Sequence, residues 1–310
     1  MNGAPLLAWA SDHIEVPLPE GHPFPIAKYR LLRERLLAEG TLEARHVARS
    51  EPAPLEWLAA VHDEGYLERV LDGALAEAEQ RRIGMPWSPG LVARARAAAY
   101  GTAMAARAAL RHGIAGNLAG GTHHAYRDRG EGYCLFNDHA VAIALLRAEG
   151  AALRPFVADL DVHQGNGTAA IFAGDETVFT FSVHGERNYP ALKERGSFDL
   201  ELPDGTGDDA YLAALERHLP RALDLHEPDL VFYQAGVDAL ASDRFGRLGL
   251  SHHGLRARDE RVFRWCAERA LPVVVTMGGG YARPIEATVE AHANVWRAAR
   301  AALAARAGAA

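Results

Sequence analysis

Short apolar runs alternate with longer amphipathic stretches along this chain of 310 residues. Apolar runs predict strands, and apolar residues at helical spacing predict helices. We expect strands at residues 6–10, 115–119, 155–161, 178–183, 229–235 and 272–277, and a short strand-like piece after Gly40. We expect helices at residues 26–37, within 55–76, and at 91–111, 139–149, 168–173, 209–225, 255–269 and 284–305. Residues 81–90, rich in proline and glycine, predict a loop.

The alternation of strand and helix becomes regular after residue 115. Strands separated by helices need right-handed crossover connections, which build a mostly parallel central sheet with helices on both faces. A chain of this length can bury one large core. No internal repeat, low-complexity linker or break in composition marks a second domain. The sequence therefore predicts a single α/β domain spanning residues 1–310.

Charge and composition argue against several classes of function. The net charge is -7 with a pI near 6.1, so no global basic field favours direct nucleic acid binding. The two cysteines, Cys134 and Cys266, cannot build a disulfide framework. The apolar run at residues 6–10 is too short for a signal sequence, and no run is long enough to span a bilayer. We predict a cytoplasmic enzyme without a membrane partner, and the sequence does not indicate its oligomeric state.

Three polar residues occupy alternate positions at the end of the strand predicted at 155–161, namely Asp159, Asp161 and His163. Successive strand side chains point to opposite faces, so these three are expected to project to the same side. Two glycines follow directly and end the strand. Two carboxylates and an imidazole on one side indicate a metal site. A hydrogen-bonded strand end that caps the next helix fits these three residues equally well.

Three further strands also run into polar or glycine-rich segments. These segments are His123-His124, the loop that contains Asp238, and Gly278-Gly279-Gly280-Tyr281. In open parallel sheets the ligand crevice lies beyond the carboxyl ends of the strands. Four such ends along one chain therefore predict a shared site.

Asp161, His163 and Asp238 would offer a metal ion one nitrogen and two oxygen ligands, and would leave a position open for water, as in catalytic zinc sites. The same donor set suits Fe²⁺, so the ligands are better defined than the metal. For Asp238 alone, a helix or turn cap within residues 238–243 is the alternative.

The adjacent His123 and His124 follow two glycines, and we expect both rings to be presented to a ligand. Adjacent residues of an extended segment point apart, so both cannot easily be ordinary core histidines. Asp159 and Asn166 are available to orient the two rings. Tyr281 lies on a loop from which its hydroxyl could donate to a polarised carbonyl, although a Gly-Gly-Gly-Tyr turn is more often structural.

Five motifs occur in a fixed order along the chain. They are residues 120–125 (Gly-Gly-Thr-His-His-Ala), 132–138 (Gly-Tyr-Cys-Leu-Phe-Asn-Asp), 159–167 (Asp-Leu-Asp-Val-His-Gln-Gly-Asn-Gly), 234–238 (Gln-Ala-Gly-Val-Asp) and 278–281 (Gly-Gly-Gly-Tyr). In this order and spacing they resemble the zinc-dependent histone deacetylase superfamily, from about His22 to the last helix. Residues 163–167, 236–238 and 243–251 look most like its class IV branch. The resemblance implies a three-layer, arginase-like fold and hydrolysis of the amide of an acylated amine.

The resemblance also implies roles for individual residues. They are zinc ligands (Asp161, His163, Asp238), tandem histidines (His123, His124) paired with Asp159 and Asn166, a carbonyl-polarising tyrosine (Tyr281), tunnel walls (Gly132, Tyr133) and a structural potassium site (Asp159, Asp161, His163, Ser182). Several family members have aspartate where Asn166 stands, so His124 is expected to lack a carboxylate partner. Lys28 falls near a position that is arginine in many relatives, at the foot of the pocket.

The implied activity is metal-dependent removal of acyl groups from lysine side chains of proteins or peptides. An acetylpolyamine amidohydrolase is the main alternative, and a non-catalytic acyl-lysine-binding protein is disfavoured by the complete set of ligands, histidines and tyrosine. A two-manganese ureohydrolase would need carboxylates just after Asp238, where Ala239-Leu240-Ala241 stand. The expected rim loops, 81–90 and 184–195, present no net acidic gate, which favours lysine over a polyamine.

Overall fold

The computed structural model describes residues 4–152 and 154–309. Within these residues eight strands form one sheet in the order β2-β1-β3-β8-β7-β4-β5-β6. The strands are β1 (Leu7–Ala10), β2 (Val47–Arg49), β3 (Ile114–Asn117), β4 (Pro155–Asp159), β5 (Phe179–Gly185), β6 (Phe198–Leu202), β7 (Leu230–Gln234) and β8 (Val273–Thr276). Every neighbouring pair is parallel, which confirms the predicted fold class.

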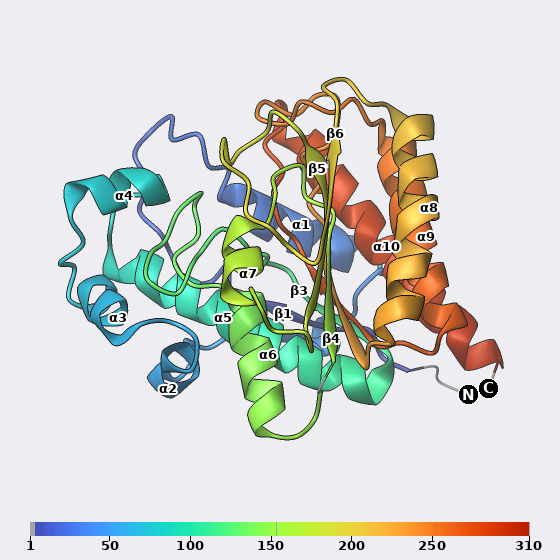
Figure 1. The fold of residues 1–310 in the computed structure, drawn as a ribbon, viewed down its shortest axis with the longest axis horizontal. Coiled ribbons are helices and arrows are strands. Elements are labelled where there is room, and N and C mark those ends of the chain that lie inside the picture. Colours follow the sequence, from blue (N-terminus) through green and yellow to red (C-terminus); the bar gives the residue numbers. More distant parts are fainter. Residues whose placement is uncertain (1–3, 153, 310) are drawn as a thin grey trace.

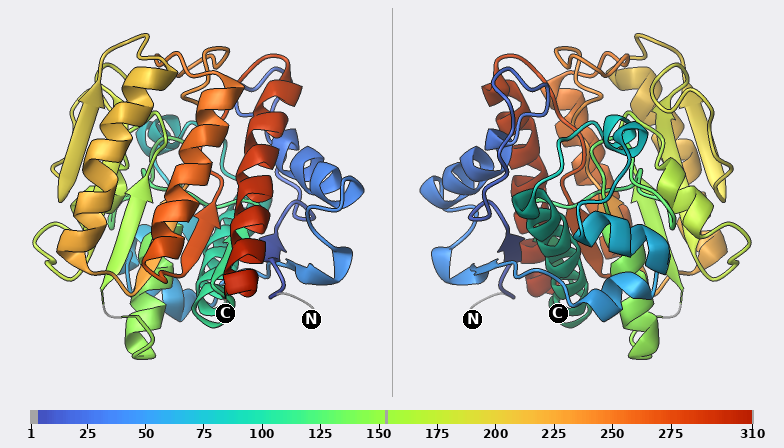
Figure 2. Two further views of the ribbon diagram at one scale, coloured as in Figure 1. Left: turned by 90° about the vertical axis from the view of Figure 1, so that its right-hand side faces the viewer. Right: turned by 90° about the vertical axis from the view of Figure 1, so that its left-hand side faces the viewer.

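Helices cover both faces of the sheet (Figure 1). They are α1 (Ala27–Ala38), α2 (Leu55–Ala59), α3 (Glu64–Leu71), α4 (Glu77–Ile83), α5 (Pro89–His112), α6 (Asp138–Ala148), α7 (Asn166–Ile171), α8 (Asp208–His226), α9 (His252–Glu268) and α10 (Ile285–Ala309), with a short 3-10 turn at Ala44–His46. Figure 2 shows α8, α9 and α10 side by side on one face with α1 beside α10, while α5 and α6 lie on the other face. None of the helices within the described residues is long and apolar enough to cross a bilayer.

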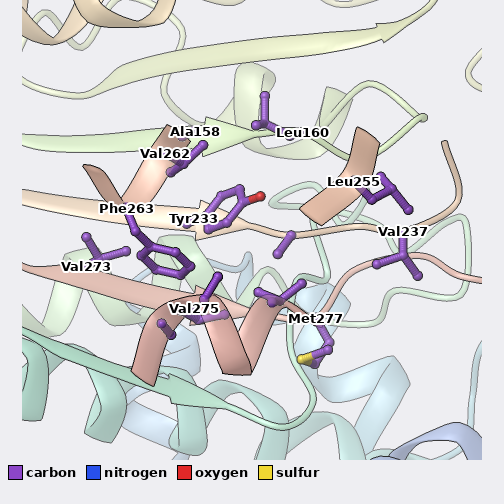
Figure 3. Close-up of a cluster of buried hydrophobic side chains, with 14 of the residues drawn as sticks. Ala158, Leu160, Tyr233, Val237, Leu255, Val262, Phe263, Val273, Val275 and Met277 are labelled. Atoms are coloured by element: carbon purple, nitrogen blue, oxygen red, sulfur yellow. The ribbon is translucent and has the colours of Figure 1, made fainter. Parts of the chain in front are cut away.

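The central strands are apolar on both sides because each face is covered. Val231 and Tyr233 of β7 pack into the core beneath α9, whereas Phe232 of the same strand packs toward α5 and α6. Figure 3 shows Val262 and Phe263 of α9 packed over this sheet face. Continuous apolar runs are typical of parallel strands buried on both faces.

Several element bounds differ from the sequence prediction. Helix α4 extends to Ile83 and so covers the start of the segment expected to be a loop, and α5 begins at Pro89. The Ser88 hydroxyl caps α5 by accepting a hydrogen bond from the Leu91 N–H at 3.0 Å, and proline suits the first helical position. Strand β6 was not predicted. It is a five-residue edge strand in which three apolar residues alternate with Asp199 and Glu201.

The strand order decides where the polar loops meet. Strands β3, β8, β7 and β4 are consecutive neighbours in the sheet, although they are far apart in the sequence. Because all strands are parallel, their carboxyl ends lie at the same edge. The loops that follow these four strands carry the histidine pair, Tyr281, Asp238 and the Asp161/His163 segment. They therefore surround one site.

Candidate active site

Two buried carboxylates and the partly buried His163 form a candidate metal-binding group. One donor atom from each of Asp161, His163 and Asp238 lies within 4.8 Å of the others. His163 Nδ1 is 3.0 Å from Asp161 Oδ1 and 3.0 Å from Asp238 Oδ2. Strand β4 ends at Asp159, so the prediction that Asp161 and His163 extend a strand is wrong. They lie in the bend beyond it, and the bend brings their side chains together.

Backbone groups hold the two carboxylates in place. The Gly279 N–H donates to Asp161 Oδ2 at 2.6 Å, and the Val162 N–H donates to Asp238 Oδ1 at 2.9 Å. A Cβ atom at Gly279 would overlap Asp238 Oδ2. The loop after β8 can therefore approach the site this closely only because glycine has no side chain.

The donor set fits a divalent cation. Burial and the negative charge of Asp161 together raise the pKa of Asp238 to about 7, although His163 acts in the opposite direction. Two carboxylates buried side by side repel each other unless a positive charge lies between them. Two oxygens and one imidazole nitrogen are ligands that Zn²⁺ and Fe²⁺ both accept.

The two adjacent histidines lie in a turn rather than in an extended segment, with ring centroids 4.0 Å apart. His123 Nδ1 lies 2.6 Å from Asp159 Oδ2, and His124 Nδ1 lies 2.6 Å from Asn166 Oδ1. The structure thus brings together both pairs that the family resemblance implied. In each ring the partner occupies Nδ1, so Nε2 remains for chemistry.

The two rings differ in their electrostatic environment. Burial lowers the pKa of His124 well below its usual value, and the neighbouring His123 and His163 add to this effect. Burial also opposes the charged form of His123, but Asp159 and Asp161 outweigh it and raise the pKa of His123 to about 9. A neutral imidazole suits a proton acceptor, and a charged one suits a group that stabilises negative charge.

A cavity of about 400 Å³ opens onto these groups. Its inner walls include His124, His163, Gly132, Tyr133 and Tyr281. Its other lining residues are Arg81, Arg82, Ile83, Gly84, Arg187, Asn188, Tyr189, Phe245 and Arg247. The described lining therefore contains four arginines and no carboxylate.

A tight turn forms one wall of the cavity. Gly132 and Tyr133 have positive φ values of 55° and 67°, and the Cys134 N–H donates to the Glu131 carbonyl at 2.9 Å. Two central residues with positive φ are typical of a type I′ turn. A Cβ atom at residue 132 would lie 2.5 Å from His124 Cδ2, so glycine lets this wall touch the histidine.

Tyr281 faces the same cavity from the opposite loop. Its N–H donates to Asp243 Oδ2 at 2.6 Å, and its ring lies 4.9 Å from the Phe245 ring and 6.1 Å from the Tyr133 ring. Burial raises the pKa of the Tyr281 hydroxyl well above its usual value. The group therefore stays protonated and can donate a hydrogen bond at neutral pH.

Lys28 lies behind this loop, at the foot of the site. Its ammonium group donates to the carbonyls of Gly278 at 3.0 Å and Gly280 at 3.4 Å, and it lies 5.2 Å from the Tyr281 ring centroid. Burial lowers the pKa of Lys28 to about 8, while Asp238 and Asp161 oppose this shift. Lys28 thus holds the loop that carries Tyr281.

The potassium site implied by the resemblance stays a prediction. Asp159 and Ser182 are register partners in the β4–β5 pair, which places their backbones side by side. Ser182 Oγ lies 2.8 Å from His184 Nδ1.

Sequence reasoning missed several residues around the histidines. Asn166 Nδ2 donates to Glu131 Oε1 at 2.5 Å and to the Tyr126 hydroxyl at 3.0 Å. The Tyr189 ring packs edge-on against His124, with centroids 5.0 Å apart. These residues lie in loops away from the strand ends. Of these residues, only Glu131 could have been suspected from the sequence, because it directly precedes the Gly-Tyr-Cys motif.

Comparison with known proteins agrees with this geometry. Residues 22–299 match the histone deacetylase domain family. The chain is 46% identical to an uncharacterized protein of Picosynechococcus sp., over 92% of this chain and 95% of that protein. It is 34% identical to the histone deacetylase-like amidohydrolase of Pseudomonas aeruginosa, over 86% of this chain and 74% of that protein.

A solved structure supports the fold. The crystal structure of a histone deacetylase homologue from Aquifex aeolicus superposes with a TM-score of 0.79 at 24% identity, covering 94% of this chain and 83% of the other. With the domain match across most of its length, this chain belongs to the histone deacetylase family.

Proposed function

We propose that this protein is a zinc-dependent deacylase that hydrolyses the amide of acylated lysine side chains in proteins or peptides. The observation that carries the proposal is that one cavity is lined by His163 of the Asp161/His163/Asp238 group, by His124 of the histidine pair and by Tyr281. A binding protein without activity would need neither a neutral histidine nor an oxyanion donor. We assign the catalytic unit to residues 1–310.

The ligands would hold Zn²⁺, with Fe²⁺ as the second candidate. A bound ion of this kind polarises a carbonyl and lowers the pKa of water to about 7. His124 would accept the proton of the attacking water through Nε2 as the carbon–oxygen bond forms and return it to the amine nitrogen as the amide C–N bond breaks, a role worth roughly 10²–10⁴ in rate. His123, paired with Asp159, stabilises negative charge. The Tyr281 hydroxyl donates to the developing oxyanion.

Charge at the cavity mouth supports a lysine substrate over a polyamine. An acylpolyamine carries a further ammonium group, which would need a carboxylate near the entrance. The described cavity lining has four arginines and no carboxylate. An acyl-lysine stem is uncharged and can pack along the aromatic wall that Tyr133 and Tyr281 form in the cavity, where the two ring centroids lie 6.1 Å apart.

The test compares kcat/KM for acetyl-lysine peptides, longer acyl-lysine peptides, acetylspermidine and acetylputrescine in one buffer. Zinc-loaded and iron-loaded protein are assayed in parallel with chelator-treated protein. We expect acyl-lysine peptides to lead. A polyamine that wins by more than about tenfold, about 1.4 kcal/mol of transition-state preference, would move the protein to the polyamine class.

We also propose a cytoplasmic location, without direct nucleic acid binding and without a membrane partner. The net charge of -7 supports the last two points because it provides no attraction toward anionic polymers or anionic membrane surfaces.

A further inference from the structure

We propose that Glu131 is a positioning residue that sets the tautomer of His124 through Asn166. The inference rests on the proposed function, in which His124 is the proton acceptor. It concerns a residue that lies outside the five sequence motifs and is not among the cavity-lining residues. The argument depends on which atoms can donate and which can only accept.

The side-chain amide of Asn166 has one orientation that satisfies its neighbours. The Glu131 carboxylate, 8% exposed, can only accept a hydrogen bond, and its Oε1 lies 2.5 Å from the Asn166 amide nitrogen. The Tyr126 hydroxyl donates to Glu194 Oε1 at 3.1 Å, so it accepts from the same amide nitrogen at 3.0 Å. Both contacts favour the NH₂ group on this side, but only the Glu131 carboxylate imposes it, because a tyrosine hydroxyl can also donate.

This orientation decides which nitrogen of His124 carries the proton. With the NH₂ group facing Glu131, Asn166 Oδ1 faces His124 Nδ1 at 2.6 Å. A carbonyl oxygen only accepts, so Nδ1 must carry a hydrogen. The other nitrogen, Nε2, is then unprotonated in the neutral ring and available as a base.

From the sequence, His124 is expected to lack a carboxylate partner because residue 166 is asparagine. The structure supplies a carboxylate indirectly, since Glu131 accepts a hydrogen bond from Asn166. An aspartate at position 166 would bind His124 directly, whereas here the carboxylate stands one side chain farther out. The position of the Glu131 carboxylate follows from the turn at residues 131–134. The positive φ values in this turn let Tyr133 line the cavity while Glu131 contacts Asn166. Asn166 thus relays the orienting effect of Glu131 to the histidine.

The first test is Glu131→Gln in the metal-loaded enzyme. Glutamine keeps the shape but can present either an oxygen or an NH₂ group, so it no longer imposes one amide orientation. We expect kcat to fall at least about tenfold with KM changed less than about twofold, since losing the correct tautomer of a catalytic histidine costs up to about 10⁴ elsewhere. Asp128→Asn is the matched control, because it removes the same charge from an exposed side chain of the same segment and should leave kcat unchanged.

The second test is a double-mutant cycle with Asn166→Asp. This change places a second carboxylate against Glu131, so the single variant should lose both turnover and thermal stability. Adding Glu131→Gln removes the repulsion and lets the new glutamine donate to the introduced aspartate. The double variant should recover kcat at least about tenfold relative to Asn166→Asp and should regain most of the lost Tm.

Wild-type turnover of acyl-lysine peptides tests the proposed function separately from this inference. If the wild type hydrolyses these peptides and Glu131→Gln keeps full kcat, the positioning role is wrong. A double variant no more active and no more stable than Asn166→Asp alone also overturns it. If the wild type hydrolyses a different acylated amine, the same variants are compared on that substrate.

Discussion

The fully buried guanidinium of Arg258 donates a 2.7 Å hydrogen bond to the carbonyl oxygen of Gly236. The same nitrogen donates to the Leu160 carbonyl at 3.1 Å. These two carbonyls begin the segments after β7 and β4, which carry Asp238 and Asp161. From its buried position on α9, Arg258 therefore connects the backbone of the segment that carries Asp161 to the backbone of the segment that carries Asp238. Its charge is paired with Asp259 at 2.8 Å.

Replacing this arginine should affect both stability and metal binding. Arg258→Met leaves Asp259 as an uncompensated buried charge, which typically costs about 3–5 kcal/mol of unfolding free energy. It also frees the two loop carbonyls, so zinc affinity should fall. Chemical denaturation and zinc competition with a chelator measure the two effects. Arg256→Met, at an exposed position of the same helix, should change stability by less than about 0.5 kcal/mol.

Variants at a proposed metal ligand should lose the metal, whereas variants at a proposed catalytic group should keep it. Asp238→Ala should lose both metal and activity. His124→Ala and Tyr281→Phe should each lower kcat by about 10²–10³ while metal content stays normal, since neither side chain is a ligand. Elemental analysis and steady-state kinetics measure this split. Tyr100→Phe, which alters a tyrosine stacked on Trp57 outside the cavity lining, is the control. Full kcat in Tyr281→Phe would refute the oxyanion role.

A single methyl group at Gly279 should disrupt the metal group. The added Cβ would overlap Oδ2 of Asp238, a proposed ligand whose Oδ1 accepts a hydrogen bond from the Val162 N–H. We expect Gly279→Ala to bind zinc at least about tenfold more weakly in a chelator competition, the size of effect seen when the support of a metal ligand is lost. The Gly207→Ala control adds the same methyl group where the nearest atom is 3.9 Å away. Equal zinc affinity in both variants would contradict this account.

His62 should make stability depend on pH. Its Nδ1 lies 2.9 Å from the Tyr126 carbonyl and its Nε2 accepts from the Asn137 N–H at 3.1 Å, so the folded protein holds a neutral ring. Burial lowers the pKa of His62 to about 4, against 6.5 when unfolded. Below pH 6.5 His62 is protonated in the unfolded chain but stays neutral in the folded protein. The free energy of unfolding therefore falls as the pH falls toward about 4.

The loss from His62 should reach about 3 kcal/mol across this pH range. Denaturation curves at several pH values measure it as the slope of unfolding free energy. His62→Gln should flatten the slope between pH 4 and 6.5, whatever its effect on absolute stability. His253→Gln, an exposed histidine at the start of α9, should leave the slope as in the wild type. An unchanged slope in His62→Gln would show that other groups dominate.

Charge at the cavity mouth should control the choice between amines. Arg82 lines the cavity and is exposed, so Arg82→Glu would place a carboxylate where an acylpolyamine has its second cation. We expect the ratio of kcat/KM for acetylspermidine over an acetyl-lysine peptide to rise several-fold, and to rise less at high salt because the charge is screened. Arg264→Glu on the exposed face of α9 is the control. An unchanged kcat/KM ratio in Arg82→Glu would mean that groups other than residue 82 determine the substrate preference.

Taken by itself, the sequence determined the fold class and pointed to the side chains of the candidate metal site. The two side-chain periods, 2 for strands and 3.6 for helices, are local properties, so the strand and helix alternation could be predicted from neighbouring residues. The polar residues after apolar strands, such as Asp161 and Asp238, are local exceptions to that pattern. Strand β6 carries the period of 2 as well, since apolar and polar residues alternate from Phe198 to Leu202, so here the sequence analysis missed a local signal.

Only the tertiary structure decided how these residues work together. The order β3-β8-β7-β4 makes neighbours of four strand ends that are separated by up to half of the chain, and no local pattern encodes that order. The contact between Glu131 and Asn166 joins a loop to the start of α7 across 35 residues, and Arg258 reaches Leu160 across 98 residues. Such contacts depend on how the sheet and its helices pack. Sequence periodicity records which way each side chain faces, whereas the packing determines what it meets.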